Sequence, residues 1–205
     1  MKVGEAWSCQ PDRDLDRTRT ARATIGDRAE LFVDANGGYT QKQAIRMAGS
    51  FQELGVTWFE EPVSSDHLAG LAEVRTQTPI DVAAGEYGYD LFNFEAMRAA
   101  GAVDCLQVDI SRCAGLTEWL RVAAVAEAHG LQVSGHCAQS LHLHPACAID
   151  NIRHLEYFDD HARVDRLLFE GVVDPVDGVM RPDLSRTGLG LELTQAVADR
   201  YRVSG

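Results

Sequence analysis

The chain has 205 residues, of which 45% are hydrophobic and 24% are charged, a composition typical of one ordinary globular domain. Its formal net charge of −12 argues against nucleic acid or an anionic membrane as a partner, because both require a basic surface. The five cysteines are odd in number and show no Cys-x-x-Cys spacing, so we expect reduced thiols and a cytoplasmic location.

The first residues, Met1 to Gly4, resemble the end of a strand whose earlier part is missing, since only one residue precedes Lys2. A first helix is predicted over residues 11–25, with Pro11 in its first turn and Gly26 just past its end. The aspartates and arginines of this segment indicate a solvated face and not a binding patch.

Short apolar runs that end on an ionisable residue recur along the rest of the chain. Val56-Thr57-Trp58-Phe59 is the clearest of them, and two glutamates and a proline follow it. Successive runs end 26, 26, 23, 27 and 20 residues apart, counted between positions 34, 60, 86, 109, 136 and 156. The residues at these positions are Asp34, Glu60, Glu86, Asp109, His136 and Glu156.

Helices are predicted in most of the gaps from N-cap residues, from glycines after the last turn and from apolar residues at helical spacing. The expected segments are residues 41–54, 67–76, 91–100, 116–129, 140–149 and 193–203, with Thr40, Asp66 and Asp90 as N-caps. Beyond Glu156 the pattern weakens, and we expect turns there until the last helix.

Strands of four to six residues that alternate with helices predict an α/β fold with a parallel sheet. Six such units, each with an ionisable residue at the carboxyl end of its strand (the strand tip), favour a TIM-type (β/α) barrel. In such barrels the catalytic groups lie at the carboxyl ends of the strands. An open doubly wound sheet is the alternative, but it usually carries a Gly-x-Gly-x-x-Gly turn, which no strand here precedes. A complete barrel needs about 250 residues, so we expect this one to be incomplete.

Three consecutive tips, Asp34, Glu60 and Glu86, are expected side by side at one mouth of the barrel. Three carboxylates in a low-dielectric cleft repel one another unless a cation neutralises them. Oxygen ligands without thiolate or imidazole suit a hard ion, and positions left open for substrate and water suit Mg²⁺. The alternative is that each is a separate solvated carboxylate at the start of a loop.

Asp109 and His136 end the next two strands and should also be neighbours. A carboxylate bonded to one imidazole nitrogen fixes the tautomer and raises the basicity of the other nitrogen, which makes a general base. Glu156 is either a rim carboxylate or an acid that donates a hydrogen bond to a substrate oxygen. Lys2, across the mouth from His136, is either solvent-exposed or a second base.

Two other groups carry reactive or metal-binding side chains, but their positions in the chain are less favourable. Cys137 directly follows His136 and could act as a nucleophile. His142 and His144 could form a ligand pair of a metallohydrolase, but they follow a late strand and not the first one.

The tips lie within longer motifs that resemble the C-terminal barrel domain of the enolase superfamily. Within it, the chain is most similar to the mandelate racemase subgroup of the mandelate racemase/muconate lactonizing enzyme family. The matching motifs are Val33-Asp34-Ala35-Asn36-Gly37-Gly38-Tyr39-Thr40, Phe59-Glu60-Glu61-Pro62, Ala84-Gly85-Glu86, Asp109 followed by Ala114-Gly115-Leu116-Thr117, and Gly135-His136.

The resemblance implies a metal-dependent reaction, in which the proton α to a carboxylate is abstracted and the ene-diolate is stabilised by Mg²⁺. Dehydration of a sugar acid is the expected reaction, and racemisation or epimerisation of a 2-hydroxy acid is the alternative. A small carboxylate is the expected partner, and we expect the full-length parent to be a homo-oligomer. The implied residues are Asp34, Glu60 and Glu86 as ligands, Asp109 and His136 as the base dyad, Lys2 as second base and Glu156 as electrophilic acid.

Relative to the family pattern, the N-terminal capping domain, the first barrel strand and most of the second are missing, and Ala114-Gly115 replaces the usual Gly-Gly. We therefore expect Met1 to correspond to an internal methionine of a longer parent. Expressed alone, residues 1–205 should be aggregation-prone or oligomeric, because open strand edges leave backbone groups unpaired. A catalytically silent barrel fragment is thus a further hypothesis for this chain.

Overall fold

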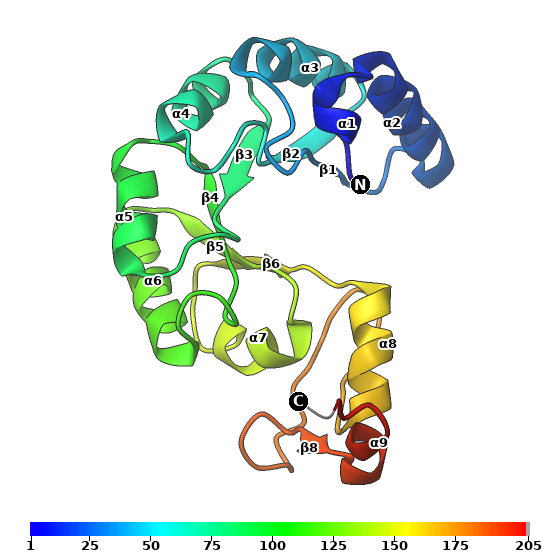
Figure 1. Cartoon of the computed structure of the whole chain (residues 1–205). Helices are drawn as coiled ribbons and strands as arrows, with labels where there is room; N and C mark the ends of the chain where they lie inside the picture. Colours follow the sequence, from blue (N-terminus) through cyan, green and yellow to red (C-terminus); the bar gives the residue numbers. More distant parts are fainter. Residues whose placement is uncertain (204–205) are drawn as a thin grey trace.

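The computed structural model describes residues 1–203, in which a parallel sheet curls around an open centre with helices on its outer side (Figure 1). The strand order is β1-β2-β3-β4-β5-β6, which excludes a doubly wound sheet. This is the predicted incomplete (β/α) barrel, since β6 does not pair with β1 in residues 1–203. The strands are β1 Leu31–Asp34, β2 Val56–Glu60, β3 Asp81–Ala84, β4 Cys105–Val108, β5 Gln132–Gly135 and β6 Ile152–Leu155.

The parallel register brings the carboxyl ends of the strands to one edge of the sheet. Asp34 lies opposite Glu60 in the β1–β2 pair. On the other side of β1, Lys2 forms a parallel bridge with Asp34, and the Val3 N–H donates to the Asp34 carbonyl at 2.7 Å. The first residues therefore lie beside β1, as expected for the end of a strand, but they form a single bridge and not a regular strand.

The connecting helices bury their apolar sides against the sheet, where the ring of Phe51 meets that of Phe59 edge-on at 5.4 Å. Thr40 and Asp90 are N-caps, as predicted. The Thr40 N–H donates to the Gln43 side chain, and the Asp90 side chain accepts from the Asn93 N–H. The helices are α1 Glu5–Ser8, α2 Pro11–Ile25, α3 Gln41–Glu53, α4 Leu68–Thr76, α5 Leu91–Ala99, α6 Leu116–Ala128, α7 Gln139–Ala146, α8 Asp159–Leu168 and α9 Gln195–Arg200.

The expectation that only turns lie between Glu156 and the last helix is wrong for residues 159–168, where α8 forms, whereas turns do follow it at residues 177–178, 184–185 and 188–189. Asp159 and Asp160 lie in its first turn and Arg166 in its last, an arrangement that complements the helix dipole. Its apolar stripe is short, with Ala162 as its fully buried residue.

Two helix boundaries also differ from the prediction. The N-cap of α4 is His67 and not Asp66, whose N–H instead lies 3.3 Å from the Ser64 hydroxyl in a turn. The last helix begins at Gln195 and not at Leu193, because the residues before it pair antiparallel with the two residues that follow α8. That pair consists of β7 Phe169–Glu170 and β8 Glu192–Leu193. None of the helices in residues 1–203 has the length and apolarity needed to cross a membrane.

A buried carboxylate on α2 ties the segment after Lys2 to the rest of the domain. Asp14 Oδ2 accepts from the Gly4 N–H at 2.9 Å and from the Tyr39 hydroxyl at 2.7 Å. Burial and the neighbouring Asp14 carboxylate both raise the pKa of Tyr39, so its hydroxyl stays protonated and can donate. This network fixes the backbone two residues after Lys2.

Asp14→Ala should lower the free energy of unfolding by about 1–3 kcal/mol, because the buried Tyr39 hydroxyl loses its acceptor. Chemical denaturation measures this change. Asp16→Ala, at an exposed site on the same helix, is the matched control and should stay within about 0.5 kcal/mol of the wild type. Equal stability of the two variants would show that the network does not hold the segment.

Candidate active site

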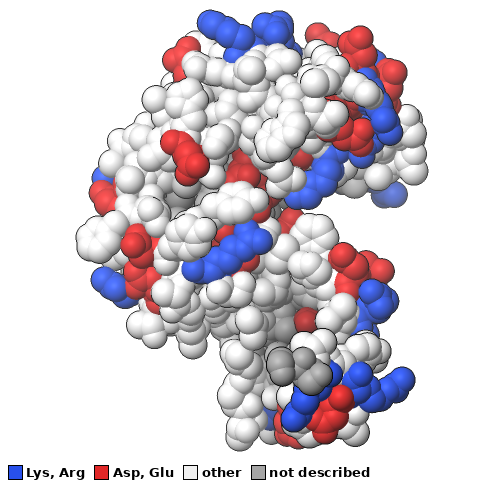
Figure 2. Space-filling model, viewed as in Figure 1, with Lys and Arg blue, Asp and Glu red and all other residues white. Residues whose placement is uncertain are grey.

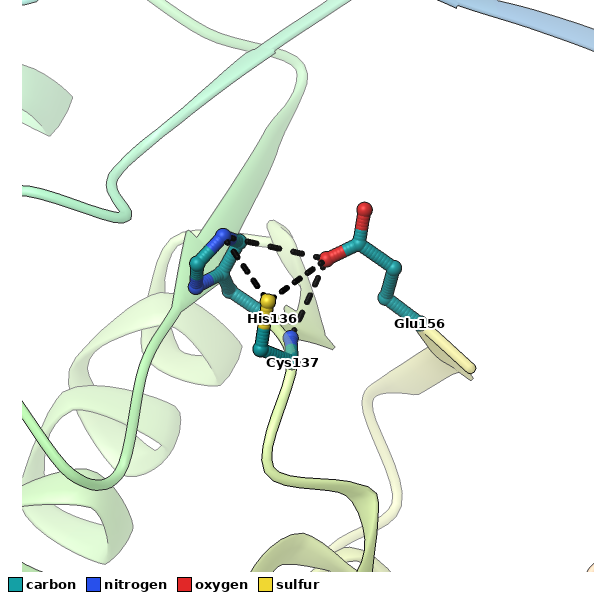
Figure 3. Close-up of side chains that lie close together, drawn as sticks. All are labelled: His136, Cys137 and Glu156. Atoms are coloured by element: carbon teal, nitrogen blue, oxygen red, sulfur yellow. Dashed lines mark hydrogen bonds and ion pairs between the residues drawn. The ribbon is translucent and has the colours of Figure 1, made fainter. Parts of the chain in front are cut away.

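The residues at the ends of β5 and β6 lie against each other at the open mouth of the sheet (Figure 3). His136 Nε2 is 3.8 Å from Glu156 Oε2. The backbone N–H of Cys137 donates to the same Glu156 oxygen at 3.0 Å. The carboxylate of Glu156 is therefore aimed at the imidazole.

His136 and Asp109 form the contact that their strand positions predicted. His136 Nδ1 lies 2.8 Å from Asp109 Oδ2, and Asp109 Oδ1 accepts from the N–H and the hydroxyl of Ser111 at 2.7 Å and 2.6 Å. Burial opposes the charge of Asp109, but these hydrogen bonds outweigh it and lower its pKa to about 2. The ionised carboxylate holds a proton on Nδ1, which leaves Nε2 as the basic nitrogen.

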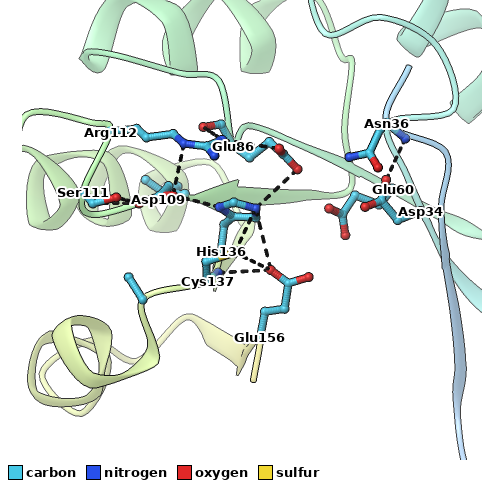
Figure 4. A network of polar contacts seen from close by, with 12 residues as sticks. Asp34, Asn36, Glu60, Glu86, Asp109, Ser111, Arg112, His136, Cys137 and Glu156 are labelled. Atoms are coloured by element: carbon cyan, nitrogen blue, oxygen red, sulfur yellow. Dashed lines mark hydrogen bonds and ion pairs between the residues drawn. The ribbon is translucent and has the colours of Figure 1, made fainter. Parts of the chain in front are cut away.

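The three carboxylates predicted to meet do converge (Figure 4). Asp34, Glu60 and Glu86 are buried, and one oxygen from each lies within 4.8 Å of the other two. Burial and the charge of Asp34 raise the pKa of Glu60 to about 9. Glu60 Oε1 and Glu86 Oε2 are buried without a hydrogen-bond partner in the described part of the chain. Orphaned oxygens and crowded like charges fit a divalent cation with oxygen ligands, such as Mg²⁺.

Lys2 lies beside β1, across the mouth from His136 on β5 as predicted, but it is not a free amine. Its ammonium forms an ion pair with Asp34. Burial lowers the pKa of Lys2, but the hydrogen bond and charge of Asp34 outweigh burial and raise it. The lysine is thus held charged against one of the carboxylates, and it can act as a base only after leaving Asp34.

Two charged residues near the site were not predicted. Arg112 Nη1 is 3.3 Å from Glu86 Oε1, and Arg112 Nε is 3.4 Å from Asp109 Oδ2, so one guanidinium bridges the carboxylate cluster and the dyad. Its position three residues after a strand tip was the available signal. Glu61 is fully buried, and burial together with the charge of Glu86 raises its pKa to about 8.

The other candidate groups lack the required chemistry. Burial and the charge of Glu156 raise the pKa of Cys137 to about 12, which disfavours a free thiolate nucleophile. His142 is buried, with Nε2 3.0 Å from the Ile110 N–H and Nδ1 3.0 Å from the Cys137 carbonyl. Neither His142 nor His144 belongs to a potential metal-ligand group in residues 1–203. The metallohydrolase hypothesis is therefore wrong.

A cleft of about 390 Å³ opens on the inner side of the curled sheet. Figure 2 shows this side of the molecule hollowed between the N-terminal helices and the C-terminal segment. The cleft mixes charged groups with aromatic walls, which suits a small polar ligand. Its lining includes Lys2, Asp34, Glu60, Gln107 and Glu156 together with Phe32, Trp58, His154 and Phe158.

The sequence matches the enolase C-terminal domain-like family over residues 1–197. This chain belongs to that family. The D-galactarolactone cycloisomerase of Agrobacterium fabrum is 31% identical over 206 residues, which cover 94% of this chain and 54% of the relative. The family predicted from the motifs around the strand tips is thus confirmed.

Solved structures of family members superpose closely on this chain. A mandelate racemase/muconate lactonizing enzyme-like protein from Rubrobacter xylanophilus does so with a TM-score of 0.90 at 47% identity, covering 98% of this chain and 55% of that one. The L-talarate/galactarate dehydratase from Salmonella typhimurium LT2, liganded with Mg and L-lyxarohydroxamate, gives 0.88 at 28% identity, with coverages of 97% and 49%. This chain therefore spans about half the length of the enzymes that it resembles.

Proposed function

We propose that this chain carries the active site of a Mg²⁺-dependent enzyme that abstracts the proton α to a carboxylate and dehydrates a sugar acid. The observation that supports it best is the position of the dyad. His136 Nε2 lies 3.5 Å from Glu86 Oε2, so the basic nitrogen faces the carboxylate cluster. A substrate whose carboxylate is held at that cluster presents its α carbon to Nε2.

Asp34, Glu60 and Glu86 are the residues that would hold the ion. When bound, Mg²⁺ supplies positive charge beside the substrate carboxylate, which makes the α proton more acidic. His136 Nε2 takes this proton, and the Asp109 carboxylate stabilises the resulting imidazolium. The imidazolium then donates the proton to the departing β-hydroxyl, which leaves as water. In this proposal Glu156, whose Oε2 lies 3.8 Å from Nε2, is the electrophilic acid that hydrogen-bonds to a substrate oxygen.

Racemisation is the second candidate, and the position of Lys2 favours it. Lys2 and His136 lie on opposite sides of the mouth, as a two-base reaction requires. The ion pair of Lys2 with Asp34 leaves only one basic group available, however, and dehydration needs only His136. The names of the cycloisomerase and the dehydratase both support a sugar acid or its lactone as substrate, and the name of the dehydratase also supports dehydration.

The test is an assay of a panel of sugar acids with Mg²⁺ in D₂O. It uses residues 1–205 and any longer product of the same gene, since the relatives are about twice as long as this chain. We expect one sugar acid to lose water and to yield a keto-deoxy acid, and EDTA to stop the reaction. Deuterium entering the α position without loss of water would favour racemisation. Failure of every sugar acid and 2-hydroxy acid to exchange its α proton would contradict the proposal.

A further inference from the structure

Cys137 has no part in the proposed reaction, yet its thiol lies within the site (Figure 3). Adjacent side chains of an extended strand point to opposite faces. After β5, however, Cys137 has φ 46° and Ala138 has φ 39°, both in the left-handed region that residues with a Cβ rarely adopt. This bend turns the sulfur back toward the imidazole of His136.

The three side chains at this point are spaced like the ligands of one metal ion. Cys137 Sγ is 3.3 Å from His136 Nε2 and 3.7 Å from Glu156 Oε2, and the latter two atoms are 3.8 Å apart. Tetrahedral Zn²⁺, with bonds of about 2.3 Å to sulfur and about 2.0–2.2 Å to nitrogen and oxygen, separates its ligand atoms by about 3.4–3.6 Å. The measured distances agree with that geometry to within about 0.4 Å.

The surroundings of His136 also match those of a metal-ligating histidine. Such a histidine donates its other ring N–H to a carboxylate, which orients the ring and makes the ligating nitrogen more basic. His136 Nδ1 has this contact with Asp109, at 2.8 Å. The backbone N–H of Cys137 also orients Glu156, by donating at 3.0 Å to Oε2, the proposed ligand oxygen, which keeps a second lone pair for an ion.

We propose that His136, Cys137 and Glu156 form a second cation site, for a borderline-soft ion such as Zn²⁺. It is distinct from the all-oxygen cluster of Asp34, Glu60 and Glu86, because thiolate and imidazole ligands favour Zn²⁺ over Mg²⁺. Binding displaces the thiol proton to solvent and requires no oxidant. Three protein ligands leave the fourth tetrahedral position for water or another small ligand.

The site has a consequence for catalysis, and this consequence rests on the proposed function. An ion bound to His136 Nε2 occupies the lone pair that takes the substrate proton. Zn²⁺ should therefore inhibit an enzyme that Mg²⁺ activates.

Binding is tested by titrating the protein with Cd²⁺, a Zn²⁺ substitute, in excess Mg²⁺. The readout is the ultraviolet charge-transfer absorption of a cadmium–thiolate bond, to which an all-oxygen site does not contribute. We expect the signal to disappear in Cys137→Ser, and Glu156→Gln to weaken Cd²⁺ binding by at least about 10-fold. The double variant Cys9→Ser/Cys147→Ser, which removes the two exposed thiols, should keep the full signal. Loss of the cadmium–thiolate signal in the double variant, or its persistence in Cys137→Ser, would overturn the proposed cation site.

A second measurement uses only the wild-type protein, so it does not depend on the folding of any variant. Alkylation of each cysteine is followed by mass spectrometry with and without Zn²⁺. Zn²⁺ should slow the alkylation of Cys137 and leave that of the exposed Cys9 unchanged. Equal protection of both cysteines, or of neither, would contradict the proposal.

The inhibition is tested separately, with each rate given relative to the same variant without Zn²⁺. Zn²⁺ should inhibit the wild type, and Cys137→Ser should relieve that inhibition. Cd²⁺ binding at Cys137 without inhibition by Zn²⁺ would contradict the role of His136 in the proposed function and leave the cation site intact. If Cd²⁺ does not bind at Cys137, the proposed cation site is wrong, whether or not Zn²⁺ inhibits the enzyme.

Discussion

His136→Asn should lower kcat/KM by about 10²–10⁴-fold, the contribution typical of a general acid–base group. Asparagine keeps a polar group near Asp109 but cannot take a proton from carbon. Mg²⁺ affinity should change little, because the predicted ligands are the three carboxylates and not the imidazole. Turnover and calorimetric titration with Mg²⁺ measure the two effects on the same sample.

Two further variants separate this role from a general effect of losing a histidine. His129→Asn, at an exposed site after α6, should leave turnover unchanged. Asp109→Asn should cause a smaller loss than His136→Asn, because it disturbs the tautomer of His136 but keeps the imidazole. A His136→Asn protein with near-normal turnover would rule out the dyad as the base.

Glu60→Gln should abolish the stabilisation of the fold by Mg²⁺. For the wild type, Mg²⁺ at 100 times its Kd should raise the free energy of unfolding by about 2.7 kcal/mol. In EDTA the variant should be at least as stable as the wild type, because folding of the wild type must protonate Glu60, whose pKa burial and the charge of Asp34 raise to about 9, and a neutral Gln does not carry this cost. Urea denaturation with and without Mg²⁺ measures both differences.

The matched control for this experiment is Glu73→Gln, which alters an exposed glutamate on α4. It should keep the full response to Mg²⁺. If Glu60→Gln responded to Mg²⁺ as strongly as this control, the ion would not be bound by the carboxylate cluster.

The arrangement of the site could be predicted from the sequence because a buried parallel strand appears there as a short apolar run. Its apolar run ends where the chain reaches the mouth, so the six tips had to share one edge of the sheet. The contact of His136 with Asp109 at 2.8 Å and the convergence of Asp34, Glu60 and Glu86 follow from that register.

Contacts that depend on the conformation of a loop correspond to no such pattern in the sequence. The turn at Cys137 places its thiol beside His136 through a left-handed φ, which no periodicity encodes. The ion pair of Lys2 with Asp34 and the bridging position of Arg112 depend on flexible side chains. Helix α8 was missed for another reason, since so few of its residues are buried.

The proposed function depends above all on the binding of one Mg²⁺ ion by the carboxylates of Asp34, Glu60 and Glu86 beside His136. A crystal structure of the protein soaked with Mg²⁺, or with Mn²⁺ for its anomalous signal, tests it most directly. We predict one ion at about 2.1 Å from an oxygen of each carboxylate, with His136 Nε2 facing it but not bound to it. Carboxylates more than about 6 Å apart, too far for bonds of that length to one ion, or an ion bound elsewhere, would contradict the account.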